Sequence, residues 1–116
     1  MHTHHAIDYI EFTVRDVAAA KRFYAKAFGW SFADDGPEYA GIKGSDGGEV
    51  GGLRRGDEQR TRGPLVILYS DDLEASLAAV TAAGGSILEA PYSFPGGRRF
   101  HFADPSGNEL AVWSSR

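Results

Sequence analysis

The feature that most constrains the fold of this chain is an internal repeat, in which one pattern of elements occurs twice. The pairs Tyr9 and Leu65, Asp16 and Asp72, Val17 and Leu73, and Gly29 and Gly85 are each 56 positions apart (16 and 72, for example). The pairs Gly47 and Gly107, Glu49 and Glu109, and Val50 and Leu110 follow at a spacing of 60 (49 and 109, for example). Because helix caps, helix ends and hairpin glycines all match, duplication explains the pattern better than two chance strand–helix units.

The first copy begins with an alternating strand followed by an amphipathic helix. Apolar and polar side chains alternate along Asp8–Val14, which indicates a strand with one face on a core. Asp16 stands at the N-cap position before a helix at Val17–Phe28, and Gly29 is a typical residue after a helix C-terminus. The predicted apolar stripe of this helix consists of Ala20, Phe23, Tyr24, Ala27 and Phe28.

The same signals predict the other elements. Strands are expected at Trp30–Ala33, Tyr39–Lys43, Glu49–Arg54, Pro64–Ser70, Ser86–Glu89, Arg98–Ala103 and Glu109–Ser114, and a second helix at Leu73–Ala83. We therefore predict an α+β fold, with two tandem βαβββ modules forming curved sheets around a shared cleft. The chain is expected to be one domain, with module one at about 6–54, a linker at 55–63 and module two at about 64–114.

Composition excludes several classes of function. The chain has no cysteine, which excludes disulfides, thiolate metal sites and cysteine nucleophiles. Its 12 basic and 16 acidic residues give a net charge of −4, which argues against nucleic-acid binding. The N-terminus does not resemble a signal peptide, and the longest apolar run, Leu65–Tyr69, is too short for a membrane span, so we expect a soluble, cytoplasmic protein. Its 15 glycines predict many tight turns.

Strand alternation sorts the side chains of the predicted sheets into two faces. The face toward the helices is expected to carry Ile10, Phe12, Val14, Val66, Leu68, Phe100, Phe102, Leu110 and Val112. The face toward the cleft is expected to carry Tyr9, Glu11, Thr13, Leu65, Ile67, Tyr69, Arg99, His101, Glu109, Ala111 and Trp113. The second set combines apolar, aromatic and ionisable groups, as ligand sites do.

Two series of motifs resemble a known family. The first module carries Asp8–Asp16, Phe23-Tyr24 and Phe28-Gly29-Trp30, and the second carries Asp71-Asp72-Leu73, Ala82–Gly85 and Phe102–Asn108. In combination these resemble the vicinal oxygen chelate superfamily, the group of glyoxalases, bleomycin-resistance proteins and extradiol dioxygenases. The resemblance covers nearly the whole chain, and it implies paired βαβββ modules around a U-shaped cleft and homodimers.

The resemblance also implies where a divalent metal would bind. Metal-dependent members commonly place a His on the first strand of each module and a Glu on the last strand. The corresponding positions here are Tyr9, Gly51, Leu65 and Ala111. Three of these residues have no donor atom in their side chain, whereas a catalytic metal needs about three protein ligands. We therefore predict that the usual metal site is absent and that no cofactor is bound.

The candidate catalytic residues are Glu11 and His101. Glu11 interrupts an apolar strand, and a carboxylate in a partly apolar cleft suits a general base. The alternative for Glu11 is an ion pair with Arg99 or another cation. His101 is a candidate acid or base, or else a structural histidine with hydrogen-bonded ring nitrogens. Together the two residues would offer only two ligands to a displaced metal.

The candidate ligand-binding residues are Tyr9, Thr13, Tyr69, Arg99 and Trp113. The three aromatic residues form either the floor of a pocket or part of the core. Three other segments are interpreted as structural: a mobile, solvated end with His2, His4 and His5, a solvated linker with Arg54, Arg55, Arg60 and Arg62, and a loop or mobile lip at 93–97.

These inferences favour a small-molecule binding protein that is independent of metal and whose cleft holds aromatics, Glu11 and His101. An acidic protein with a carboxylate in its cleft favours a cationic or hydrogen-bond-donating ligand. The first alternative is a lyase, isomerase or dioxygenase-like enzyme that uses Glu11 as a base, with or without a divalent metal at a non-standard site. The second is a structural or partner-binding domain whose cleft is filled by side chains. We expect a homodimer, with neither nucleic acid nor membrane as a partner.

Overall fold

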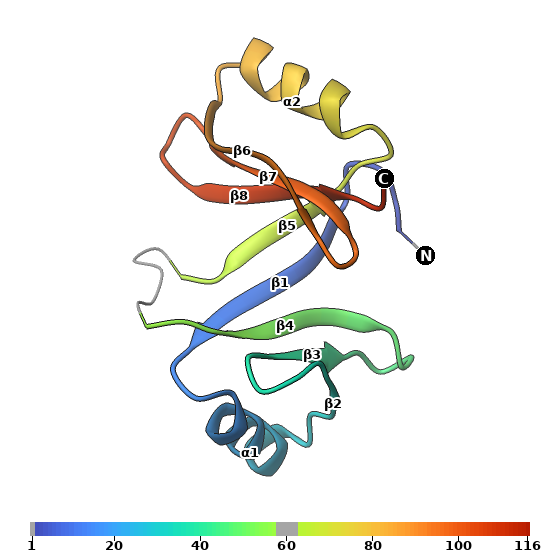
Figure 1. Cartoon of the computed structure of the whole chain (residues 1–116), viewed down its shortest axis with the longest axis vertical. Helices are drawn as coiled ribbons and strands as arrows, with labels where there is room; N and C mark the ends of the chain where they lie inside the picture. Colours follow the sequence, from blue (N-terminus) through green and yellow to red (C-terminus); the bar gives the residue numbers. More distant parts are fainter. Residues whose placement is uncertain (1, 58–62) are drawn as a thin grey trace. The chain divides into compact units, whose positions relative to one another are not determined.

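The computed structural model describes residues 2–57 and 63–116, which form two compact units (Figure 1). One unit contains residues 9–64, and the other contains residues 1–8 together with 65–116. Each has four strands and one helix in the order βαβββ, so the prediction of an α+β chain of two tandem modules is confirmed. Within the described ranges, neither helix is long and apolar enough to cross a membrane. Arg60 and Arg62 of the predicted linker lie outside these ranges.

The unit of residues 9–64, called here the α1 unit, contains a sheet in the order β2-β3-β4-β1. Its elements are β1 (Ile7–Val14), α1 (Val17–Phe28), β2 (Phe32–Asp34), β3 (Tyr39–Lys43) and β4 (Glu49–Arg55). β1 and β4 are parallel, and the other neighbours are antiparallel. α1 begins as predicted, because the Asp16 carboxylate accepts a hydrogen bond from the Ala19 N–H at 3.0 Å. It ends at Gly29, whose φ of 74° is in the left-handed region.

The core of the α1 unit lies between α1 and one face of this sheet. Val17, Ala40, Ile42 and Leu53 are buried there, and Phe12, Val14, Ala20 and Tyr24 pack against them. The predicted helix stripe is partly wrong, because Phe23 and Phe28 are 60% and 66% exposed. The strand predicted from Trp30 begins only at Phe32, since the Trp30 ring instead stacks on Tyr24 with centroids 4.7 Å apart.

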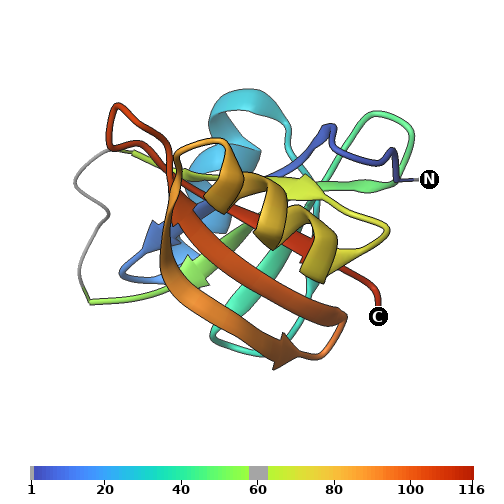
Figure 2. The same cartoon turned by 90° about the horizontal axis from the view of Figure 1, so that it is seen from above.

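The other unit, called here the α2 unit, repeats this arrangement with a sheet in the order β5-β8-β7-β6. Its elements are β5 (Leu65–Tyr69), α2 (Leu73–Ala82), β6 (Ser86–Phe94), β7 (Gly97–Ala103) and β8 (Glu109–Ser114). The Asp72 carboxylate caps α2 by accepting from the Ala75 N–H at 3.1 Å, as predicted. α2 lies along the sheet strands (Figure 2), and Leu73, Phe100 and Val112 form the buried core between them.

β6 corrects one sequence-based interpretation. The sequence predicts a strand only at Ser86–Glu89, and residues 93–97 are interpreted as a loop or mobile lip. In the structure β6 continues to Phe94, and Tyr92 pairs with Arg99 on β7. Pro91 is tolerated because β6 is the end strand of its unit's sheet and the register is irregular between Glu89 and Tyr92.

The N-terminal segment corrects another interpretation, since it is not a free end. The His5 N–H donates to the Tyr69 carbonyl at 2.7 Å, and the Tyr69 N–H donates to the Ala6 carbonyl at 3.2 Å. The His4 ring accepts a hydrogen bond from the Asp71 N–H at 2.9 Å. These contacts place the beginning of the chain in the α2 unit.

Candidate functional site

In the α1 unit, acidic and phenolic groups meet on the sheet face opposite α1. The Tyr9 and Tyr39 hydroxyl oxygens are 2.7 Å apart. Tyr9 Oη lies 3.0 Å from Glu49 Oε2, and Tyr39 Oη lies 3.2 Å from Glu11 Oε2. These four residues, called here the acid–phenol cluster, extend from the buried Glu11, which is 4% exposed, to the exposed Glu49.

Two strand glycines make room for the acid–phenol cluster. Gly41 on β3 and Gly52 on β4 are register partners, and Gly52 is also the partner of Glu11 on β1. A Cβ atom at Gly41 would overlap the Glu49 carboxylate, and one at Gly52 would overlap the Tyr39 hydroxyl. The carboxylates and phenols of the cluster therefore lie directly over the backbone of Gly41 and Gly52, which carries no side chain. These glycines serve close approach within strands, a role that differs from the turns predicted for this composition.

The acid–phenol cluster is rich in acceptors. Its three oxygen–oxygen contacts require three hydrogens if each is a full hydrogen bond, but the two phenols supply only two. Burial is the largest cause that raises the pKa of both Tyr9 and Tyr39, so both phenols keep their hydrogens at neutral pH. In this cluster the phenols are therefore the donors and the carboxylates are the acceptors.

In the α2 unit, His101 lies at the centre of a second polar group. His101 is 2% exposed and stands beside Ala111 on β8 and Glu89 on β6. Its Nε2 lies 2.8 Å from the Tyr92 hydroxyl oxygen, and its Nδ1 lies 2.9 Å from Glu109 Oε2. Arg99 Nε donates a hydrogen bond to the same Tyr92 oxygen. We call the chain of Arg99, Tyr92, His101 and Glu109 the His101 relay.

The donors and acceptors of the His101 relay determine its hydrogen positions. A carboxylate only accepts, so the single hydrogen of the neutral His101 ring lies on Nδ1 and faces Glu109, and Nε2 accepts from the Tyr92 hydroxyl, whose oxygen accepts in turn from Arg99. Burial is the main cause that lowers the pKa of His101, which matches a neutral imidazole.

Aromatic side chains lie next to the His101 relay. Tyr69 on β5 and Trp113 on β8 are register partners, with ring centroids 5.1 Å apart at an interplanar angle of 72°. The Trp113 indole donates to Asp8 Oδ2 at 3.0 Å, and the His2 ring stacks on Tyr69 with centroids 4.9 Å apart. The Phe94 ring lies 6.0 Å from Trp113. Tyr69 and Trp113 thus belong to one aromatic cluster that other side chains partly cover.

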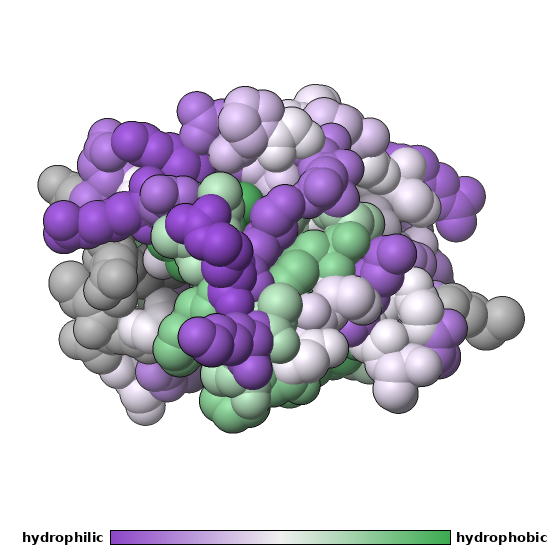
Figure 3. Space-filling view, turned by 90° about the horizontal axis from the view of Figure 1, so that it is seen from below, coloured by the Kyte–Doolittle hydropathy of each residue, from purple (hydrophilic) through white to green (hydrophobic). Residues whose placement is uncertain are grey.

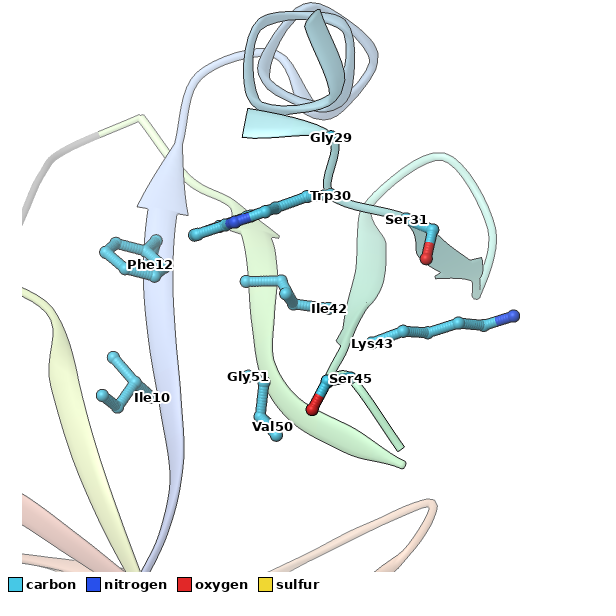
Figure 4. Close-up of a pocket in the computed structure, with 11 residues that line it drawn as sticks. Ile10, Phe12, Gly29, Trp30, Ser31, Ile42, Lys43, Ser45, Val50 and Gly51 are labelled. Carbon is cyan, nitrogen blue, oxygen red and sulfur yellow. The ribbon is translucent and has the colours of Figure 1, made fainter. Parts of the chain in front are cut away.

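The α1 unit also has a groove on the opposite face, which the sequence did not indicate. The groove has a volume of about 600 Å³, and its lining includes Ile10, Phe12, Trp30 and Ile42 (Figure 4). Ile10 and Val50 are 38% and 50% exposed, because α1 covers only part of its sheet. Seen from below, the surface shows hydrophobic areas between hydrophilic ones (Figure 3). The groove and the acid–phenol cluster occupy different faces of the sheet.

The structure brings the predicted site residues together in two groups. Tyr9 and Glu11 lie in the acid–phenol cluster, whereas Tyr69, Arg99, His101 and Trp113 lie on one face of the α2 unit. Thr13 is half-buried and pairs with Arg54 on β4. Sequence reasoning missed Tyr39, Glu49 and Tyr92 as members of these groups. Counting back from a hairpin turn at Pro95-Gly96 would have placed Tyr92 opposite Arg99, because Phe94 pairs with Gly97 and Ser93 with Arg98.

A family model agrees with this architecture. The model described as the Glyoxalase/Bleomycin resistance protein/Dioxygenase superfamily matches residues 6–112. The chain belongs to this superfamily. The positions of this chain that correspond to the ligands of metal-dependent members are Tyr9, Gly51, Leu65 and Ala111.

These positions do not fit a metal in the usual arrangement. Leu65 and Ala111 are fully buried and have no donor atom, and a side chain at Gly51 would meet the Ile10 carbonyl. Tyr9 has a donor oxygen, but it is occupied by contacts with Tyr39 and Glu49. In the described ranges 2–57 and 63–116, no group of three or more His, Asp or Glu side chains is placed to hold a metal ion. No step is therefore assigned to a metal at these positions.

Two curated Streptomyces proteins are similar in sequence to this chain. The chain is 32% identical over 117 aligned positions to the anthracycline biosynthesis protein DnrV of Streptomyces peucetius, covering 84% of this chain and 42% of that protein. The anthracycline biosynthesis protein DauV of Streptomyces sp. (strain C5) matches with the same identity and coverage. The chain spans about two fifths of the length of these relatives.

Solved structures show the same fold. The Mn(II)-bound glyoxalase from Novosphingobium aromaticivorans is 32% identical with a TM-score of 0.71, covering 99% of this chain and 40% of that one. A methylmalonyl-CoA epimerase from Streptomyces coelicolor has a TM-score of 0.70 at 18% identity, covering 97% of this chain and 98% of that one. At this lower identity the likeness concerns the fold alone.

Proposed function

We propose that this chain binds a small organic molecule that donates hydrogen bonds or carries a positive charge. The observation that carries the proposal is the acid–phenol cluster, in which two phenols and two carboxylates meet on one sheet face and Glu11 is buried. A chain that only had to complete a core would place apolar side chains at such positions. The net charge of −4 further favours a cationic ligand.

Both units support ligand binding on the sheet face away from the helix. In the α2 unit this face combines the apolar Leu65, Ile67 and Ala111 with the His101 relay and the aromatic Tyr69 and Trp113. Small-molecule sites typically combine apolar and aromatic lining with a few polar groups that orient the ligand.

The relatives suggest the class of ligand. The two curated relatives are described as anthracycline biosynthesis proteins. Anthracyclines are planar hydroxylated quinones, and many of them carry an amino sugar. The ammonium group suits the Glu11 carboxylate, and the planar rings suit the neighbouring aromatic side chains Tyr9 and Tyr39. We therefore propose an anthracycline, or a planar hydroxyaryl compound like it, as the ligand.

The test compares an anthracycline that carries an amino sugar with its sugar-free aglycone. Isothermal titration with the full chain should show binding of both, with about tenfold tighter binding of the cationic compound. Glu11→Gln should remove this preference, because the amide keeps the shape of the side chain and loses its charge. Glu38→Gln, at a carboxylate that is 73% exposed, is the matched control and should keep the preference.

The binding proposal includes independence from metal, which the same titration tests. Affinity should be unchanged after dialysis against a chelator and after addition of Mn²⁺. If neither compound binds the chelator-treated chain but both bind once Mn²⁺ is present, metal-independent binding is refuted. If the two compounds bind equally and Glu11→Gln changes nothing, the assignment of Glu11 is refuted.

A second candidate function is an enzyme that uses Glu11 as a base. The observation in its favour is the burial of Glu11 next to the Tyr39 hydroxyl, because such a carboxylate can accept a proton away from bulk water. Lyases, isomerases and dioxygenase-like enzymes are the classes proposed, with a divalent metal at a non-standard site as a variant. Turnover of the bound anthracycline that Glu11→Gln abolishes would favour this candidate over simple binding.

We also propose, from the family resemblance, that the chain forms a homodimer. Light scattering of the eluted protein at micromolar concentration should give about twice the mass of one 12.5 kDa chain. A single-chain mass at all concentrations would refute this proposal and leave ligand binding as a property of the monomer.

A further inference from the structure

The His101 relay has a feature that simple ligand binding does not require. Its one neutral base, the imidazole, is 2% exposed, whereas the Tyr92 side chain is half-buried and extends from β6. His101 Nε2 has the Tyr92 hydroxyl as its hydrogen-bond donor. A molecule at this face can therefore meet the Tyr92 oxygen more readily than the imidazole itself.

The relay is polarised from one end to the other. The Arg99 guanidinium donates to Tyr92, and its carbon lies 5.6 Å from the Tyr92 ring centroid. At the other end, the Glu109 carboxylate accepts from His101 Nδ1. Charge that forms at either end of the relay meets a group of opposite charge. An anion near Tyr92 faces the Arg99 guanidinium, and a proton on His101 faces the Glu109 carboxylate.

We propose that the His101 relay is a proton-accepting site that ionises an acidic hydroxyaryl ligand through the Tyr92 hydroxyl. The ligand O–H bond breaks as its proton binds Tyr92 Oη, while the original Tyr92 proton moves to His101 Nε2. The products are an aryloxide anion beside Arg99 and an imidazolium whose Nδ1–H faces Glu109. No electrons are transferred, and the proton returns to the ligand or to water when the ligand leaves.

The surroundings of His101 allow this change of charge. From β6 it faces Tyr92 and, with Nε2 3.8 Å from the carboxylate, Glu89; from β8 it faces Glu109. Arg99, two residues away on β7, lowers the pKa of His101, and the two carboxylates raise it. An aryloxide next to Arg99 would offset the effect of the guanidinium, so protonation of His101 becomes easier when the ligand ionises.

This inference rests on the proposed function, because the ligand belongs to the hydroxyaryl class named there. The probe is a hydroxyanthraquinone dye, whose absorption band moves to longer wavelength when a hydroxyl group ionises. At a pH one unit below the pKa of the free dye, we expect the bound dye to show at least a tenfold higher ratio of anion to neutral form. Tyr92→Phe should leave the bound dye neutral, and the same titration measures how much affinity the Tyr92 hydroxyl contributes.

Tyr24→Phe, which removes a phenol from α1, is the matched control and should leave both binding and ionisation unchanged. If the wild-type chain binds the dye in its neutral form, the relay proposal is overturned and the binding proposal stands. If the Tyr92→Phe complex still contains the anion, the relay is also overturned. If the dye does not bind at all, the proposed ligand class is wrong.

A measurement without ligand tests the relay in every one of these cases. Nitrogen-15 NMR of the full chain, with His101 assigned by its absence in His101→Asn, should show a neutral ring with its hydrogen on Nδ1 at pH 7. Glu109→Gln should change the ring nitrogen shifts of His101, because the acceptor on Nδ1 is altered. A ring with its hydrogen on Nε2 would overturn the proposal, because Nε2 would then be unable to accept the Tyr92 proton.

Discussion

Adding one methyl group at Gly52 should dismantle the acid–phenol cluster. A Cβ atom there would overlap the Tyr39 hydroxyl and lie within 2.7 Å of the Tyr9 oxygen. Gly52 lies in β4, paired with Glu11 on one side and Gly41 on the other, so the backbone has little freedom to move away. The Gly52→Ala change must therefore displace the two phenols.

The expected cost follows from the contacts that would be lost. The phenol–phenol hydrogen bond contributes about 1 kcal/mol, and each phenol–carboxylate bond contributes about 1.5–3 kcal/mol when it is shielded from water. The Tyr9–Glu49 bond is exposed and counts for less. Alanine in a strand also gains about 0.5–1 kcal/mol over glycine through lower chain entropy. We expect a net loss of about 2–3 kcal/mol in the free energy of unfolding.

Urea unfolding of a double-mutant set measures this effect. Once Tyr39→Ala has removed the overlapping phenol, the further change Gly52→Ala should cost less than about 1 kcal/mol. Gly48→Ala is the control glycine, because the nearest atom to its Cβ is 3.3 Å away, and it should cost little. Additive losses in the double variant, or equal losses at Gly48 and Gly52, would refute the role assigned to the Gly52 position.

Three further predictions concern stability. Burial lowers the pKa of His101, so the neutral imidazole contributes to the free energy of unfolding above the ordinary His pKa of about 6.5, and this contribution is lost as the pH falls below that value. Thermal melts of the wild-type chain should therefore depend more steeply on pH than those of His101→Asn, by up to about 1.4 kcal/mol per pH unit. Asp16→Ala and Asp72→Ala should each cost about 1 kcal/mol in urea unfolding, through loss of the helix caps, whereas equal stability to wild type would contradict the capping assignment. Phe100→Ala should cost about 3–5 kcal/mol and Phe28→Ala much less, since their side chains are 0% and 66% exposed; similar losses in urea would contradict the core described for the α2 unit.

Much of the fold was predictable because its signals are local. Asp16 and Asp72 each accept a hydrogen bond from an N–H three residues later, and this geometry depends only on the neighbouring backbone. Strand alternation likewise assigned Phe12 and Phe100 correctly to the helix-facing cores. The exposure of Phe28 was not predictable in this way, because it depends on how much of the helix the sheet covers.

The candidate site was predictable only in part. Glu11 and His101 stood out because ionisable residues interrupt apolar strands, and the structure buries both of them. Their partners Tyr39 and Tyr92 come from other strands, and their contacts depend on strand register. The register of β6 is irregular around Pro91, which a count of alternating residues does not reveal.

The sequence by itself determined the repeat of two βαβββ modules, the residues at which the two helices begin, and the absence of donor atoms at three of the four positions that correspond to metal ligands. These properties follow from the identity of the residues and their spacing along the chain, and both can be read directly from the sequence. Only the tertiary structure decided that Gly41 and Gly52 lie under a cluster of carboxylates and phenols, and that Tyr92 joins Arg99 to His101. The physical reason is that hydrogen bonds act over about 3 Å, so they depend on which strands are neighbours and in what register they pair.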